Sequence, residues 1–436
     1  MVKRLDARVA NPKKLVAELR RPGGFLSEKV RHIARRIVND VRHRGDEALL
    51  EYTERFDGVS PGPIRVPSEE IREAKAALDR GVRESLRVGI ENVRFFHKWE
   101  MDRSWETSRE GATVGQRVRP VSRAGVYVPG GHGAYPSTLL MAAVPAQVAG
   151  VKDLAVCAPP GPDGRVSQHV LAVAGVLGLG EVYRVGGAQA VGAMAYGTES
   201  IPAVDKIVGP GSDYVTAAKL EVFGVCGIDA PQGPSEIIVI ADAGAFPERV
   251  ARDLMAQAEH LSDASAVLLT PSEELIESVE PLLSGEPAEL VTLVRVRDLA
   301  HAAQVSNAYA PEHAHIISED QEAVLNDLRK VGMVAVGDMS PIALSDYAAG
   351  PSHALPTGGT AAWASPLGTH DFTVRTNYIH YTGDALAALG PHVERLARLE
   401  GFENHAESVG VRLRKDRKGG DQGDGVRRGG SLDFDV

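Results

Sequence analysis

From residue 120 onward, short runs of apolar and often β-branched residues alternate with glycine-rich turns and helical patterns. An uninterrupted apolar run is typical of a strand that is buried on both faces, as in a parallel sheet covered by crossover helices. A first set of runs is AGVYVPGG, LAVCAPP, EVYRVGG and DKIVGPGS, and a second set is EIIVIAD, SAVLLT, HAHIIS and GMVAVGD. The pattern predicts an α/β fold with two Rossmann-like parallel-sheet domains in tandem.

Helical spacing of apolar residues predicts smaller helical segments at both ends of the chain. Residues 27–58 and 68–100 combine that spacing with a charged opposite face, and Ser27 provides a helix start. Helical spacing returns after residue 366, whereas the residues beyond Lys415 are rich in Gly, Asp and Arg and predict disorder. The predicted divisions are a helical arm (1–25), a first α/β domain (26–234), a second α/β domain (235–365), a C-terminal helical segment (366–414) and a disordered tail (415–436).

Charge and composition exclude several classes of protein. The chain has 48 Lys+Arg against 58 Asp+Glu, a net charge of -10, which argues against a general nucleic-acid binder. No apolar stretch is long enough to cross a membrane. Cys157 and Cys226 lie in apolar runs and are predicted to be small buried side chains rather than reactive thiols. Few cysteines and no apolar leader at the N-terminus predict a cytoplasmic location.

Glycine loops follow predicted strands and open predicted helices in VYVPGGHGAYPST and KIVGPGSDYVTAAK. Such loops direct backbone N–H groups and a helix dipole toward an anion, often a phosphate. Neither loop matches a standard nucleotide motif, so a tight turn without a ligand is the alternative interpretation. Tyr127 and Gln189 stand at strand ends beside these loops, where open parallel sheets bind ligands.

Candidate metal ligands are spread over distant segments. RDLMAQAEHLSD reads as a helix, in which Gln257 and His260 are three residues apart and share a face. Asp346 in LSDYAAGPSHALPT and His405 in LEGFENHAESV are further candidates, because imidazole and carboxylate groups bind zinc. A polar helix face is the alternative, since no CxxC or HExxH pattern is present.

Candidate acid–base residues occur in YAPEHAHI, where Glu312 and His313 follow a proline and can reach one cavity from an irregular loop. A histidine suits general-base chemistry at neutral pH, and the neighbouring carboxylate suits a second proton transfer. An exposed acidic turn is the alternative. His353 lies in the rigid polar loop GPSHALPTGGTA, which is either a site loop or a structural turn. Four other histidines are predicted at the surface: His43, His97, His169 and His392.

Taken together, these segments resemble the histidinol dehydrogenase family. The matching stretches also include GGAQAVGAMAYGT and GIDAPQGPSEIIVIAD, occur in the family's order, and cover roughly residues 20–415. The resemblance implies an NAD-dependent oxidoreductase that acts on a CH–OH group and carries out the last steps of histidine biosynthesis. L-histidinol would be oxidised to L-histidine by way of bound histidinal, with one Zn²⁺ per subunit.

The resemblance also assigns residues. Gln257, His260, Asp346 and His405 would bind zinc and, with His313, contact the substrate; Glu312 and His313 would be the catalytic pair. Further substrate contacts would be Ser235, His353 and Glu400, with Ser137 a weaker candidate, and the NAD site would include Tyr127, Gln189 and Ser212. Family members are homodimers, so Glu400 and His405 would complete the partner's active site, and 366–414 would form the dimer contact.

Some positions depart from the family's usual pattern. The loop GPGS has Ser212 where the family usually has an amide, and Val374 and Gln232 also replace commoner residues. No proposed ligand or catalytic residue is lost. The alternative interpretations are a related dehydrogenase on the same scaffold that oxidises another small alcohol, such as sulfopropanediol, and a catalytically inactive binding protein.

Overall fold

The structure is a computed structural model that describes residues 2–20, 26–60, 62–130, 135–260 and 264–414. Contacts divide the chain into a larger unit, Met1–Asp102 with Arg119–Val374, and a smaller unit, Arg103–Val118 with Arg375–Val436. The predicted disordered tail lies outside the described residues. Among the described residues, no helix is both long and apolar enough to span a bilayer.

One parallel sheet of the larger unit is built from the second set of apolar runs. Its strands occur in the order β1 (Lys3–Asp6), β11 (Val291–Arg295), β10 (Ser265–Thr270), β9 (Glu236–Ala241), β12 (His313–Ile317) and β13 (Met333–Val336). Side chains of β9 alternate between two cores: Ile237 and Val239 in one, Ile238 and Ile240 in the other. This alternation explains why the strand is apolar throughout, since helices cover both faces.

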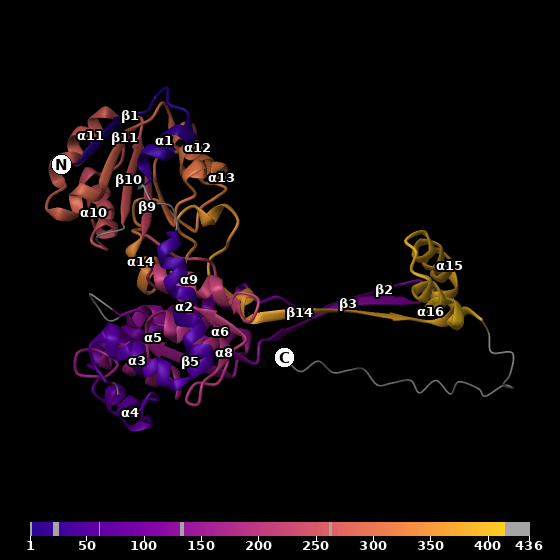
Figure 1. Cartoon of the computed structure of the whole chain (residues 1–436). Helices are drawn as coiled ribbons and strands as arrows, with labels where there is room; N and C mark the ends of the chain where they lie inside the picture. The colour runs from indigo at the N-terminus through magenta and orange to yellow at the C-terminus, as the bar shows by residue number, and fades with distance from the viewer. Residues whose placement is uncertain (1, 21–25, 61, 131–134, 261–263, 415–436) are drawn as a thin grey trace. The chain divides into compact units, whose positions relative to one another are not determined.

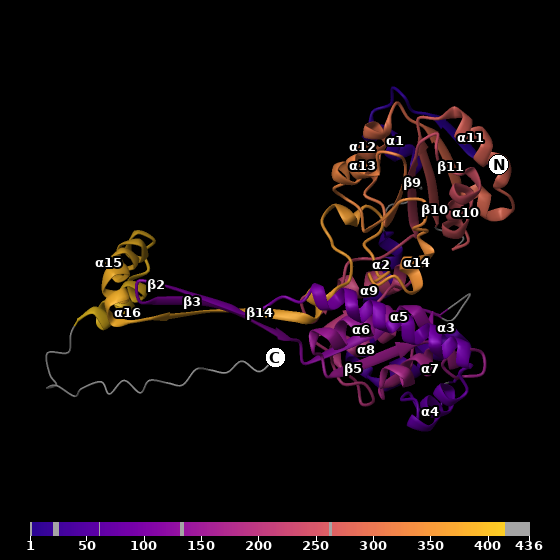
Figure 2. The same ribbon diagram turned by 180° about the vertical axis from the view of Figure 1, so that it is seen from behind.

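The covering helices of this sheet come from both halves of the chain. Figures 1 and 2 show α10 (Pro247–Ala258) and α11 (Glu273–Val279) on one face, and α1 (Pro12–Leu19), α12 (Leu299–Tyr309) and α13 (Gln321–Asp327) on the other. The short helix α14 (Ala343–Tyr347) follows β13. Short 3-10 helices occur at Glu280–Leu282, Glu286–Leu290, Thr360–Ala362 and Thr369–Phe372.

A further parallel sheet is built from the first set of runs. Its strand order is β6 (Val182–Arg184), β5 (Asp153–Ala158), β4 (Arg123–Tyr127), β7 (Lys206–Val208) and β8 (Gly227–Ile228). One core joins it to α4 (Ser68–Ala76), α5 (Arg80–Trp99), α6 (Pro136–Ala149) and α7 (Gln168–Leu177). The opposite core joins it to α2 (Glu28–Arg44), α3 (Asp46–Asp57), α8 (Gly187–Tyr196) and α9 (Asp213–Val222). The predicted α/β fold with parallel-sheet domains is confirmed.

The prediction of helices is wrong for part of each terminal segment, because each contains a strand. Lys3–Asp6 form β1, which pairs in parallel with β11. This edge strand is too short and too polar to show a period, and it forms because β11 offers it unpaired backbone groups. Thr373–Tyr381 form β14 within the segment predicted as helical. The confirmed helical parts are α1 and, near the C-terminus, α15 (Gly383–Leu399) and α16 (Glu403–Leu413).

The smaller unit contains β2 (Trp105–Arg109), β3 (Ala112–Pro120) and β14, which lie side by side in the order β14–β3–β2. β2 and β3 are antiparallel. Side-chain contacts join the strands of this three-stranded ribbon: Gln116 donates a hydrogen bond to Asn377 (3.0 Å), and Tyr378 donates one to Glu106. The two helices α15 and α16 pack on each other, with Gly390 of one facing Leu413 of the other. Figure 1 shows them beside the end of the ribbon.

Two other predictions concern single residues. Cys157 and Cys226 are buried and free, and burial raises the pKa of the Cys226 thiol to about 11, so the prediction of inert buried thiols is confirmed. His97 is fully buried rather than at the surface, where its Nδ1 lies 2.5 Å from Glu100. The prediction fails because His97 shares a face of α5 with Ile90 and Val93, which are also buried. His43, His169 and His392 are exposed as predicted.

Candidate active site

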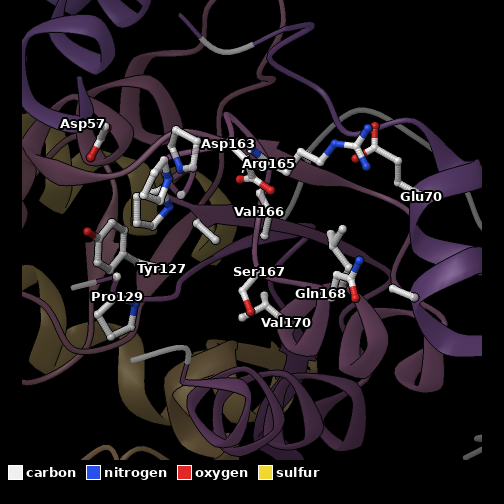
Figure 3. A pocket seen from close by; sticks show the side chains of 18 of the residues that line it. Asp57, Glu70, Tyr127, Pro129, Asp163, Arg165, Val166, Ser167, Gln168 and Val170 are labelled. Carbon is white, nitrogen blue, oxygen red and sulfur yellow. Dashed lines mark hydrogen bonds between the residues drawn. The ribbon is translucent and has the colours of Figure 1, made fainter. Parts of the chain in front are cut away.

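A cavity of about 820 Å³ opens at the carboxyl ends of β4 and β5 in the first sheet. Its wall includes Tyr127 and Ser212, two of the predicted dinucleotide contacts, together with Asp57, Glu70 and Ser167. Figure 3 looks into it, with Asp57 and Tyr127 on one side and Glu70 on the other. The volume lies within the range of small-molecule and cofactor sites, and the position is where parallel sheets bind ligands.

Tyr127 and Gln189 are fixed beside this cavity. The hydroxyl of Tyr127 accepts a hydrogen bond from the backbone N–H of Gly187 (3.0 Å), which lines the cavity and begins α8. Burial raises the pKa of Tyr127 to about 12, so its phenol keeps its proton and can donate it to a ligand. Gln189 is 1% exposed, and its side-chain oxygen has no hydrogen-bond partner among the described residues. A bound polar molecule would satisfy it.

A buried ion pair supports the GPGS loop from beneath. Lys219 donates a hydrogen bond to the carbonyl of Gly209 (3.0 Å), the backbone N–H of Gly209 donates one to Asp229 (2.8 Å), and Lys219 pairs with Asp229. Gly209 has φ of +116°, and a Cβ there would lie 2.2 Å from the carbonyl oxygen of Tyr127, so only glycine fits. Gln232, one of the unusual residues of the sequence, adds a 3.3 Å hydrogen bond to Asp229.

The predicted catalytic pair lies at the amino end of β12 in the second sheet. Glu312 precedes the strand and His313 begins it, and both are buried. The backbone N–H of Glu236, the first residue of β9, donates a hydrogen bond to the Glu312 carboxylate (2.9 Å). Gly332 lets the chain before β13 approach the main chain of Glu312, because a Cβ at that position would come within 2.6 Å of the Glu312 carbonyl oxygen. The structure thus contradicts an exposed acidic turn.

His313 lies between two carboxylates. Its Nδ1 is 3.6 Å from Glu312 and its Nε2 is 3.7 Å from Asp346. Burial would lower the pKa of His313, but the negative charges of Glu312 and Asp346 outweigh burial and raise the pKa. Neither ring nitrogen has a hydrogen-bond partner among the described residues, so both are free to meet a substrate. The two carboxylates stabilise the charged ring, so the neutral ring is a stronger proton acceptor than an ordinary histidine.

His353 faces the same site from the GPSH loop. One ring nitrogen, Nδ1, lies 2.8 Å from the carbonyl oxygen of Asp346 and must donate to it, because a carbonyl only accepts. The other, Nε2, lies 3.4 Å from the Thr138 hydroxyl in the first turn of α6, next to Ser137. Burial lowers the pKa of His353, so the ring is neutral. Residues of both sheets' domains therefore meet at this loop.

The candidate metal ligands are placed less completely. Gln257 is buried near the end of α10, but that helix ends at Ala258, so His260 lies in the following turn rather than on the predicted helix face. The positive charge of His260 is among the influences on Asp346, so the two side chains lie within electrostatic range. No three His, Cys, Asp or Glu side chains of the described residues converge as a metal site.

Other predicted substrate contacts have different outcomes. Ser235 is half-buried directly before Glu236, and so lies at the amino end of β9 with the catalytic pair. Glu400 and His405 belong to the smaller unit, where Glu400 ends α15 and His405 lies on α16 against Phe402. Their roles remain predictions.

Sequence reasoning missed several polar residues of these sites. Glu236 is buried at the start of β9, although its position in GPSE directly before an apolar run was a usable signal. His315 is buried two residues after His313, between Asp253 (2.8 Å) and the carbonyl of Gly337 (2.9 Å), and ties β12 to the helix that carries Gln257. Its position inside HAHIIS, a run predicted as a buried strand, was a usable signal for burial.

Comparison with known proteins identifies the family. The family model described as "Histidinol dehydrogenase" matches residues 23–413. The chain is 45% identical over 415 residues to histidinol dehydrogenase of Geobacillus kaustophilus, covering 91% of this chain and 97% of that one. It is 44% identical over 392 residues to that of Methanothermobacter thermautotrophicus, covering 87% and 92%. The chain belongs to the histidinol dehydrogenase family.

The family assignment agrees with the three-dimensional comparison. The crystal structure of histidinol dehydrogenase from Elizabethkingia anophelis matches with a TM-score of 0.89 at 33% identity, over 94% of this chain and 98% of that chain. Membership makes the protein an oxidoreductase. The family's motifs also coincide with the two sites described above: GGAQA and GPGS surround the cavity, whereas GPSE, APEH and GPSH meet around His313.

The Lys219–Asp229 pair gives a testable prediction about the first site. Lys219→Met should lower the free energy of unfolding by about 3–5 kcal/mol, because it leaves the Asp229 charge buried and unpaired. Lys219→Met with Asp229→Asn should lose clearly less, since no buried charge remains. Urea denaturation measures both, with the exposed Lys152→Met as the control. Equal losses in the single and double variants would contradict the role given to the ion pair.

Proposed function

We propose that this protein oxidises L-histidinol to L-histidine, in the last steps of histidine biosynthesis. Each histidinol and one water would yield histidine, two NADH from two NAD⁺, and protons. The observation that carries the proposal is the buried Glu312–His313 pair, whose histidine has unpartnered ring nitrogens between two carboxylates, in a chain of this family. The relatives reported above are all named histidinol dehydrogenases and give no support to a sulfopropanediol enzyme. Buried, unsatisfied acid–base groups also argue against an inactive binding protein.

NAD would bind in the cavity of the first sheet. Tyr127 and Ser212 line this cavity, and the buried Gln189, whose side-chain oxygen has no partner among the described residues, lies two residues after the lining residue Gly187. Ser212 begins α9 without a side-chain cap, so its hydroxyl is available to the cofactor.

Zinc would be held by Gln257, His260 and Asp346, with His405 as the fourth ligand. The donors are one imidazole, one carboxylate and one amide oxygen from the larger unit, a mixed set of the kind zinc accepts. Burial raises the pKa of Asp346, and a bound cation would reverse that effect. When bound, the zinc ion would hold the substrate and polarise its oxygen, and NAD⁺ would accept hydride.

The chain's own residues would manage the protons. His313, starting as the neutral ring, would take the alcohol proton during the first oxidation, because its ring nitrogens lack hydrogen-bond partners and the neighbouring carboxylates stabilise the charge that the ring gains. Glu312 would then take a proton from the water that attacks bound histidinal. Ser235 and neutral His353 would orient the polar end of the substrate, and keeping histidinal bound prevents its loss to solvent.

Partners and location follow from the same proposal. We infer a homodimer in which the 366–414 segment, with Glu400 and His405, completes the partner's active site. The small unit that carries these residues exposes Leu396, Leu399 and Phe402, apolar side chains that a partner would cover. The protein would work in the cytoplasm on a small molecule, without nucleic acid or a membrane.

Glu312→Gln separates the two oxidations. The variant should oxidise histidinal at least about 10²-fold more slowly than the wild type, because it cannot accept the proton of water. Its oxidation of histidinol to histidinal should fall less, whereas His313→Ala should slow both steps. Single-turnover NADH formation from histidinol and from histidinal measures the two. Wild-type rates of Glu312→Gln on histidinal would remove Glu312 from the mechanism.

His260→Ala tests the zinc ligands. The variant should bind less than one tenth of the zinc of the wild type after identical loading and desalting, because one imidazole donor is lost. Elemental analysis measures the metal content without reference to activity, and the exposed His169→Ala serves as the control. A full zinc content in His260→Ala would exclude His260 as a ligand.

A further inference from the structure

Glu236 is a buried carboxylic acid for which the proposed reaction provides no role. It is 3% exposed at the start of β9, and its side chain accepts a hydrogen bond from the backbone N–H of Gly358 (3.1 Å). That hydrogen bond joins β9 to the loop that follows the GPSH motif. The adjacent Gly233 donates a second hydrogen bond to the same loop, to the Thr357 hydroxyl (2.5 Å).

The main chain of Glu236 holds the catalytic carboxylate. Its N–H donates to Glu312 at 2.9 Å, and the parallel pairing of β9 with β12 sets His313 opposite Ile237. The side chain and the main chain of Glu236 therefore connect the GPSH loop with the catalytic pair. Because Glu312 is also buried, a change in the charge of this side chain would change the electrostatic energy of the Glu312 carboxylate.

The groups around the Glu236 side chain come from several elements. Glu312 faces it from the position directly before β12, Tyr309 from α12, and Arg20 from the end of α1. The guanidinium of Arg20 lies over the Tyr309 ring, 5.2 Å from its centre, and donates a hydrogen bond to the Tyr309 carbonyl. Burial and the negative charge of Glu312 raise the pKa of Glu236 to about 7, although Arg20 and the Gly358 N–H act in the opposite direction.

We propose that Glu236 is a positioning residue that fixes Glu312 and takes up a proton from solvent when Glu312 is ionised. Two adjacent buried carboxylates repel each other, so the ionised form of one favours the neutral form of the other. The proton bonds to a carboxyl oxygen of Glu236 and returns to solvent when Glu312 takes up a proton instead. No oxidant or reductant is needed. The role of Glu312 in catalysis rests on the proposed function, but the proton linkage between the two carboxyls does not.

Thermal unfolding tests the proton linkage directly. Because the folded protein holds the proton of Glu236 more tightly than the unfolded chain does, the contribution of Glu236 to stability falls as the pH rises toward 7 and beyond. Glu236→Gln stays neutral and keeps an acceptor for Gly358. Its Tm relative to the wild type should therefore rise by roughly 2–4 °C between pH 5 and pH 8. The exposed Glu248→Gln is the matched control and should show no such rise.

The same variant has a kinetic consequence. Only the wild type gains a second charge beside Glu312 as Glu236 loses its proton, so histidinol oxidation should change more between pH 6 and pH 8 in the wild type than in Glu236→Gln. Glu236→Ala should also lose activity that Glu236→Gln retains. A structural role alone would lower kcat in both variants by the same factor at every pH.

Particular results would overturn the inference. A Tm difference between Glu236→Gln and wild type that is the same at pH 5 and pH 8 would show that Glu236 does not titrate in this range. If Glu236→Gln does not fold, Glu312→Gln provides the reciprocal test: the pH dependence of its Tm should shift to lower pH than in the wild type, and an unchanged dependence would contradict the linkage. Absence of histidinol turnover in the wild type would reject the proposed function and leave the Tm tests valid.

Discussion

The parallel pairing of β9 with β12 is the constraint on which the Glu312–His313 site depends. It brings the start of one strand beside the start of the other, so the backbone of Glu236 reaches the carboxylate of Glu312. β9 is apolar from its second residue, and β12 adds Ile316 and Ile317 to the two cores that enclose the sheet, which leaves no freedom to shift the register. The polar residues at the strand starts are thus held by the rigid part of the fold.

The two sites use opposite edges of their sheets. The cavity lies at the carboxyl ends of β4 and β5, the usual place in an open parallel sheet, whereas the Glu312–His313 pair lies at the amino ends of β9 and β12. Residues 229–235, which connect β8 to β9, run between them. Asp229 at the beginning of this connection supports the GPGS loop, and Ser235 at its end precedes Glu236. A seven-residue connection therefore links Asp229, which supports the GPGS loop, to Ser235, which lies beside the Glu312–His313 pair.

Much of this organisation could be predicted from the sequence. Buried parallel strands are apolar throughout, so eight runs located strands correctly, and the motifs APEH and GPSH contained residues that do meet at one site. Edge strands were missed because β1 and β14 carry polar residues and show no clear period. The Lys219–Asp229 pair was missed because its two residues lie on separate elements, and a charged residue within a sequence is normally solvated. His260 was placed on a helix because spacing does not reveal where a helix ends.

The central claim is that the Glu312–His313 pair and the cavity serve one four-electron oxidation. Measuring the products formed from a limiting amount of histidinol tests this claim most directly. A fixed small amount of L-histidinol would be converted completely with excess NAD⁺ and zinc-loaded enzyme, and NADH and histidine would both be quantified. The account predicts two NADH and one histidine for each histidinol, with no free histidinal. One NADH per histidinol with histidinal released, or no turnover at all, would contradict it.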